Sequence, residues 1–160
     1  MARRVFFSFH YENDINRTMV VRKSWVLRGV EETGFKDKAE FEEVKRRGKK
    51  AIEDWIDEQL KGTTVTVVLI GEETLERPYV QYEICQSLNK GNSIIGVKIN
   101  NIKDMKTKLD SKQGNIHTVI GNKNGENVYF DNIAYGIYDY IKDDGYNNLG
   151  KWIENASNNK

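Results

Sequence analysis

Three short apolar runs constrain the fold of this chain more than any other feature. They occupy residues 5–9, 64–70 and 94–99, and none of them alternates strictly between apolar and polar side chains. A strand with one face in water alternates, whereas a strand buried on both faces is apolar along its whole length. The runs therefore predict strands of a parallel sheet that is covered on both faces.

Amphipathic segments separate these runs. Three helices are predicted. The first spans residues 15–30 and Gly34 closes that unit, the second spans residues 52–60 before Gly62, and the third runs from Pro78 to about Gly91. The charged residues 35–47 predict a surface loop with a short helix. Buried strands that alternate with helices favour right-handed crossovers and an α/β sandwich of three layers with a central, mainly parallel sheet.

The C-terminal third has weaker signals. Residues 116–120 and 128–130 flank Asn124-Gly125, which predicts a hairpin, and one of these runs is expected to supply another strand. A helix is predicted over residues 133–142, with Ile133, Ile137 and Ile141 in register. A short amphipathic helix with Leu149, Trp152 and Ile153 follows. The expected organisation is one domain over residues 1–156 and a frayed tail over residues 157–160.

Composition narrows the classes of function. The formal net charge is +1, which does not favour binding to nucleic acid or to an anionic membrane. No apolar stretch is long enough to span a bilayer, and the first apolar run is too short for a signal peptide. The only cysteine, Cys85, cannot form an intramolecular disulfide, which fits a reducing compartment. These features predict a cytoplasmic protein.

Two segments predict a site at one edge of the sheet. In doubly wound sheets, ligands bind at the carboxyl ends of the strands, where the strand order reverses. The first strand ends near Ser8, Phe9, His10 and Tyr11, and the second ends at Gly71, just before the helix that carries Tyr79 and Glu83. Aromatic walls with one acid suit a nucleotide better than a metal or a peptide.

Each of these side chains also has a plainer interpretation. Glu83 could be a solvated helix glutamate, His10 could act as a base, contact a phosphate or cap the strand end, and the aromatic rings could serve in packing. Ser8 could donate a hydrogen bond to a ribose or a phosphate. No phosphate-binding loop and no dinucleotide-binding glycine motif occurs. His10 and His117 are isolated, so no metal site is predicted.

Four ordered segments resemble the TIR-like domain of Thoeris antiphage-defence proteins. They are residues 5–11, 67–71, 79–84 and 138–147. The resemblance implies a flavodoxin-like fold, a short strand near Phe35, and chemistry on NAD as the substrate with no separate cofactor. Thr74, Tyr79 and Glu83 match the serine or threonine, aromatic and glutamate positions of TIR enzymes. The site residues it implies are catalytic Glu83 and substrate-binding Ser8, Phe9, His10, Tyr11, Asp37, Phe41 and Tyr79.

The resemblance also implies a reaction. A TIR-like enzyme would cleave the nicotinamide–ribose bond of NAD and form a cyclic ADP-ribose-type signal that activates a partner effector. Activity could depend on a phage-derived trigger or on assembly into a homo-oligomer. Tyr79-Val80 replaces the usual tryptophan-cysteine pair of the family. The alternatives are a TIR-like module that binds proteins or nucleotides without catalysis, and a different nucleotide hydrolase on the same sheet.

Overall fold

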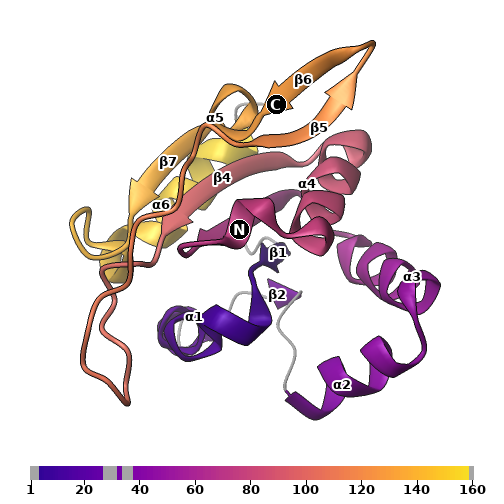
Figure 1. Cartoon of the computed structure of the whole chain (residues 1–160). Helices are drawn as coiled ribbons and strands as arrows, with labels where there is room; N and C mark the ends of the chain where they lie inside the picture. Colours follow the sequence, from indigo (N-terminus) through magenta and orange to yellow (C-terminus); the bar gives the residue numbers. More distant parts are fainter. Residues whose placement is uncertain (1–3, 27–31, 34–37, 159–160) are drawn as a thin grey trace.

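A five-stranded sheet runs through the middle of the protein, and all its strand pairs are parallel (Figure 1). The computed structural model describes residues 4–26, 32–33 and 38–158. The strand order is β2-β1-β3-β4-β7, so the order reverses at β1. This is the flavodoxin-like order. The strands are β1 (Val5–Ser8), β2 (Glu32–Thr33), β3 (Val65–Ile70), β4 (Ser93–Lys98) and β7 (Gly136–Asp139).

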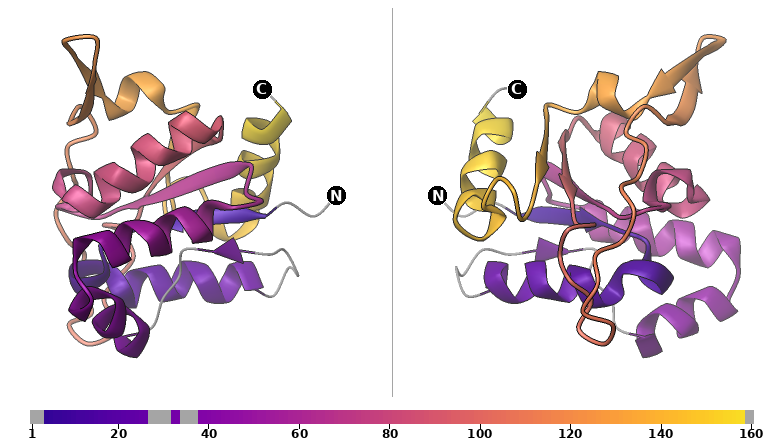
Figure 2. Two further views of the ribbon diagram at one scale, coloured as in Figure 1. Left: turned by 90° about the vertical axis from the view of Figure 1, so that its right-hand side faces the viewer. Right: turned by 60° about the vertical axis from the view of Figure 1, so that its left-hand side comes forward.

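Helices cover both faces of this sheet, which confirms the predicted α/β sandwich (Figure 2). Helices α1 (Tyr11–Val26) and α6 (Gly145–Asn158) pack on the face that presents Phe7 and Val67. Helices α3 (Lys49–Leu60) and α4 (Pro78–Lys90) pack on the face that presents Phe6 and Val68, and α2 (Lys38–Arg46) lies beside α3. Side chains of successive strand residues point to opposite faces, so each apolar run supplies two cores.

The fifth strand replaces a predicted helix. Instead of a helix over residues 133–142, a four-residue α5 (Phe130–Ile133) is followed by β7. The Tyr135 N–H donates to the Ile94 carbonyl and the Tyr140 N–H to the Lys98 carbonyl. The edge of β4 would otherwise leave backbone groups unpaired. Pairing across the sheet therefore overrides the helical spacing, and Ile141, predicted to point inward, is 53% exposed.

The predicted hairpin forms, but outside the main sheet. Strands β5 (Val119–Lys123) and β6 (Glu126–Tyr129) make a separate antiparallel pair. Asn124 and Gly125 both have positive φ angles, as tight hairpin turns require. Ile120 packs against the core beneath α4, together with Phe130. Both runs thus contribute strands, as predicted, whereas the main sheet is extended beyond β4 by β7.

Several boundaries differ from the prediction. Helix α1 begins at Tyr11 and not at Ile15, so Phe9 and His10 form the connection after β1. Helix α6 ends at Asn158, so it extends two residues into the tail predicted from residue 157. The short strand implied near Phe35 is β2, which pairs with β1; Phe35 itself lies outside the described residues. Among the described helices, none is long and apolar enough to cross a membrane.

Candidate functional site

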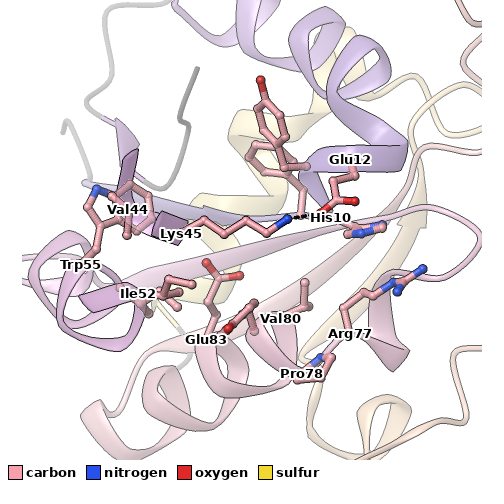
Figure 3. A pocket seen from close by; sticks show the side chains of 14 residues that line it. His10, Glu12, Val44, Lys45, Ile52, Trp55, Arg77, Pro78, Val80 and Glu83 are labelled. Carbon is pink, nitrogen blue, oxygen red and sulfur yellow. Dashed lines mark hydrogen bonds and ion pairs between the residues drawn. The ribbon is translucent and has the colours of Figure 1, made fainter. Parts of the chain in front are cut away.

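A cavity of about 200 Å³ lies at the carboxyl end of β1, close to where the strand order reverses (Figure 3). The start of α1, helices α2 and α3, and the first turns of α4 surround it. Its lining residues are Phe9, His10, Tyr11, Glu12, Val44, Lys45, Ile52, Trp55, Ile56, Arg77, Pro78, Tyr79, Val80 and Glu83. The cavity therefore lies at the edge that the strand pattern predicts.

Glu83 is the most deeply placed acid of this cavity. It belongs to α4, beside the buried Ile84, and its side chain is only 3% exposed. The Ser8 hydroxyl donates a hydrogen bond of 2.7 Å to Glu83 Oε1. Pro78 starts α4 directly after the extended residue Arg77, and this start brings Glu83 beneath the cavity one turn and a half later. A buried carboxylate held in this way can stabilise positive charge that develops in the cavity.

The structure brings most of the predicted site residues together. Phe9, His10, Tyr11, Tyr79 and Glu83 all line the cavity. Phe9 is also part of the core beneath α1, whereas Tyr79 is 38% exposed at the rim. These rings supply the aromatic walls that the sequence predicts.

Three predicted residues have other placements. Ser8 is fully buried and is not among the lining residues, so its contact is with Glu83 and not with the cavity. Asp37 lies outside the described residues. Phe41 belongs to α2, but its side chain lies outside what the structure describes.

Sequence reasoning missed four polar or aromatic lining residues. Trp55 shares the apolar stripe of Ile52 and Ile56, and this spacing alone predicts a core position. Its indole does pack against that core, and it also lies in the cavity wall (Figure 3). Glu12, Lys45 and Arg77 were not selected because single charged residues are usually solvated. The one available signal was the position of Arg77 just before the proline that opens a helix at the binding edge.

Charged side chains form two pairs around the cavity. Lys45 Nζ lies 3.4 Å from Glu12 Oε1, and Arg77 Nη2 donates to Glu73 Oε1 at 2.7 Å. Burial lowers the pKa of His10 below its usual value, and the positive charge of Arg77 lowers it further. The carboxylates of Glu12 and Glu73 act in the opposite direction, but the net effect lowers the His10 pKa, so the imidazole favours its neutral form.

A second buried acid, Asp14, lies under the loop that follows β3. Its side chain is 3% exposed and accepts a hydrogen bond of 3.1 Å from the Thr74 hydroxyl, which in turn accepts from the Gly71 N–H at 2.8 Å. A Cβ atom at Gly71 would overlap the Asp14 carboxylate. Burial raises the Asp14 pKa to about 6. Thr74, which the TIR pattern singles out, thus braces this loop in the 3₁₀ turn η1 (Thr74–Glu76).

Acidic and histidine side chains do not gather into a metal site in the part of the chain that the structure describes. No group of three His, Cys, Asp or Glu side chains lies close enough together to hold an ion there. The site described above is therefore built from one buried acid, aromatic rings and paired charges.

Comparison with known proteins identifies the family. The sequence model of the family described as "Thoeris protein ThsB, TIR-like domain" matches residues 6–104, more than half of the chain. This chain belongs to that family. The match includes most of β1, the loop after β3 and the whole of α4, so every described residue that lines the cavity falls within it. It ends before the β5–β6 hairpin.

A curated relative of this TIR-like family extends the similarity over the full length. A protein of Bacillus cereus (strain MSX-D12) named "Putative cyclic ADP-D-ribose synthase ThsB1" is 35% identical to this chain. The alignment of 191 positions covers 96% of this chain and 100% of that relative. The C-terminal third, including β7 and α6, thus has a counterpart in the relative.

Proposed function

We propose that this protein cleaves the nicotinamide–ribose bond of NAD and closes the remaining ADP-ribose into a cyclic product. The observation that carries the proposal is Glu83, a buried carboxylate held by Ser8 beneath a cavity with aromatic walls. The family membership and the name of the Bacillus cereus relative, a cyclic ADP-D-ribose synthase, support the same reaction.

One carboxylate is enough for this cleavage. The nicotinamide ring of NAD carries a positive charge, so the electron pair of the broken C–N bond neutralises the ring and nicotinamide leaves without a proton. Ordinary glycosidases need a second carboxyl group to protonate the leaving oxygen. Glu83 would accept hydrogen bonds from the ribose hydroxyls and stabilise the oxocarbenium-like charge left on the sugar.

The second half of the reaction depends on water exclusion. A hydroxyl group of the same ADP-ribose attacks the cationic carbon, forms the new C–O bond and releases one proton. Bulk water would attack instead in an open site and give linear ADP-ribose. Glu83 is buried at the base of a largely apolar cavity, which favours the internal hydroxyl over water. Phe9, Tyr11, Trp55 and Tyr79 would hold the substrate by stacking and packing.

The product would act as a signal. A cyclic nucleotide released into the cytoplasm would activate a separate effector protein of the defence system. A phage-derived trigger or self-association of the chain would raise the activity by completing the cavity. NAD serves here as substrate, with no further cofactor and no metal.

Replacement of Glu83 tests this proposal. In Glu83→Gln, the amide keeps the size of the side chain but removes its negative charge, so nicotinamide release should fall by at least about 100-fold. The measurement is chromatography of NAD, nicotinamide and cyclic products, with and without lysate of phage-infected cells. Glu76→Gln is the matched control, because Glu76 is exposed in η1 and does not line the cavity.

The outcomes separate the alternatives. NAD consumption by Glu83→Gln at the wild-type rate would exclude the proposed role of Glu83. Binding of NAD without nicotinamide release, even with lysate, would favour a non-enzymatic module. Release of phosphate in place of nicotinamide would indicate a different nucleotide hydrolase.

A further inference from the structure

Two side chains of the cavity contain buried polar atoms without a hydrogen-bond partner. They are Nδ1 of His10 and Nε of Arg77. Among the described residues, such atoms occur in five side chains, and only these two residues line the cavity. Buried polar groups are nearly always paired, because an unpaired one loses its hydration without compensation. Two of them in one cavity indicate a missing polar group.

The two atoms belong to neighbouring side chains, one of which is a guanidinium held by an acid. Arg77 is close enough to His10 for its charge to lower the histidine pKa, and Figure 3 shows both side chains at the same end of the cavity. Glu73 accepts a hydrogen bond from Arg77 Nη2 at 2.7 Å, and its other oxygen accepts one from Asn13 Nδ2 at 2.6 Å. Glu73 therefore fixes the guanidinium but leaves its Nε unpaired.

The end of the cavity that contains His10 and Arg77 is nearer to solvent than the end that contains Glu83, so it would hold the outer part of a ligand. Glu83 is 3% exposed, whereas the Arg77 side chain is 39% exposed, so Arg77 lies towards the solvent. A volume of about 200 Å³ is smaller than the roughly 300–1,000 Å³ of pockets for drug-sized ligands. A whole dinucleotide exceeds it. The group next to the reacting ribose must then leave the cavity at its open end.

We propose that His10 and Arg77 form the subsite for the diphosphate group of the dinucleotide. This inference rests on the proposed function, because NAD is the ligand it assigns. The Nε–H group of Arg77 donates to one phosphate oxygen, and the neutral imidazole of His10 donates from Nδ1–H to another. A guanidinium with a fixed plane suits phosphate oxygens better than a flexible ammonium does. The diphosphate thereby satisfies both unpaired atoms and places the adjoining ribose above Glu83.

Binding of ADP-ribose tests the subsite without any turnover, since ADP-ribose has no nicotinamide to lose. Isothermal titration calorimetry would compare the wild-type protein, Arg77→Gln and Arg77→Lys. Arg77→Gln should weaken ADP-ribose binding about 10- to 100-fold, as expected for loss of a charged hydrogen bond. Arg77→Lys should recover only part of this loss. Arg46→Gln is the control, because Arg46 pairs with Glu43 on α2 and does not line the cavity.

Two further ligands identify the group that is recognised. Adenosine lacks phosphate, so its affinity should be the same for the wild-type protein and Arg77→Gln. Inorganic pyrophosphate should bind the wild-type protein and lose affinity in the variant. Unchanged ADP-ribose affinity in Arg77→Gln would overturn the subsite and leave an ordered water as the partner of the two atoms. Equal losses for ADP-ribose and adenosine would overturn it as well.

A measurement on the wild-type protein covers the case in which Arg77 variants do not fold. A bound diphosphate favours the protonated imidazole, so NMR titration should show a higher His10 pKa with ADP-ribose than without it. An unchanged His10 pKa at saturation would contradict the subsite. The assay of nicotinamide release tests the proposed cleavage separately. If release requires Glu83 but the affinity for ADP-ribose does not depend on Arg77, only the subsite is refuted. The reverse result would refute the cleavage and retain the subsite.

Discussion

At the scale of single residues, Ser8 has a different task from the one its position suggests. It stands at the carboxyl end of β1, where a hydroxyl could contact a ribose or a phosphate. Its side chain is instead fully buried, and its hydroxyl donates to Glu83 Oε1 at 2.7 Å. The hydrogen bond joins β1 to α4. Ser8 is thus a positioning residue for the proposed catalytic acid.

Replacement of Ser8 by alanine tests this role. Ser8→Ala removes the hydrogen bond that positions Glu83 Oε1, so we expect the rate of nicotinamide release to fall about tenfold, with little change in KM. Steady-state kinetics would measure both values. Thr66→Val is the matched control, because it removes another buried hydroxyl of the same sheet face, one that bonds to Ser87. It should reduce stability and leave the rate unchanged; equal rates for Ser8→Ala and the wild type would remove Ser8 from the mechanism.

At the scale of elements, α6 completes the face of the sheet that α1 leaves open. Its Leu149, Trp152 and Ile153 are buried in the core, and the Trp152 ring stacks on Tyr138 of β7 with 4.2 Å between the ring centroids. The helix continues to Asn158. A segment predicted to be a short helix with a frayed end is therefore one wall of the molecule.

Loss of the Trp152 ring should show how much this wall contributes. Trp152→Ala leaves a cavity in the core, so we expect the free energy of unfolding to fall by about 3–5 kcal/mol. Urea denaturation followed by circular dichroism would measure the change. Ile141→Ala, at a residue that is 53% exposed, should change stability by less than about 0.5 kcal/mol. Similar losses in the two variants would contradict the packing of α6 and β7 described above.

At the scale of the whole molecule, Asp14 lies where several parts of the chain meet. Its helix α1 contacts the loop after β3 through Thr74, and one turn later Arg17 donates to the carbonyls of Ile102 and Leu109. The segment after β4 is thereby held against α1. Protonation of Asp14 at this junction therefore affects the stability of the entire fold.

The sign of this connection follows from the raised pKa. The Asp14 pKa increases from 3.8 to about 6 on folding. Between these values the folded state binds more protons than the unfolded state, so the free energy of unfolding decreases as the pH rises. The favourable contribution is complete below pH 3.8 and is lost as the pH passes about 6. The change in this contribution is on the order of 1–3 kcal/mol.

Asp14→Asn should remove this part of the pH dependence. Above pH 6 the amide avoids a buried charge, so the variant should be more stable than the wild type by on the order of 1–3 kcal/mol, and the difference should shrink towards pH 4. Urea denaturation between pH 4 and pH 8 would measure it. Glu76→Gln, at an exposed acid, serves as the control. A difference between Asp14→Asn and the wild type that stays constant with pH would contradict the raised pKa.

The elements that could be predicted from the sequence are those whose burial and ends leave a signal in neighbouring residues. The runs that became β1, β3 and β4 are apolar on both faces, and Pro78 and Gly91 mark the ends of α4. Since the carboxyl ends of parallel strands share one edge, these elements were sufficient to place Glu83, Phe9 and His10 at one site. The similarity to the Thoeris TIR-like family was visible in the same segments.

Contacts between residues that are distant in the sequence depend on how the elements pack, and they could not be predicted from local patterns. The segment of β7 forms a strand because it pairs with the edge of β4. The spacing of apolar residues within the segment contains no information about that edge. Trp55 lines the cavity in addition to packing against the core. Ser8 contacts Glu83 and Arg77 lies near His10, although at least 66 residues lie between the two members of each pair. The periodicity of apolar residues indicates which side chains are buried. The residues that each buried side chain contacts depend on how the helices pack on the two faces of the sheet.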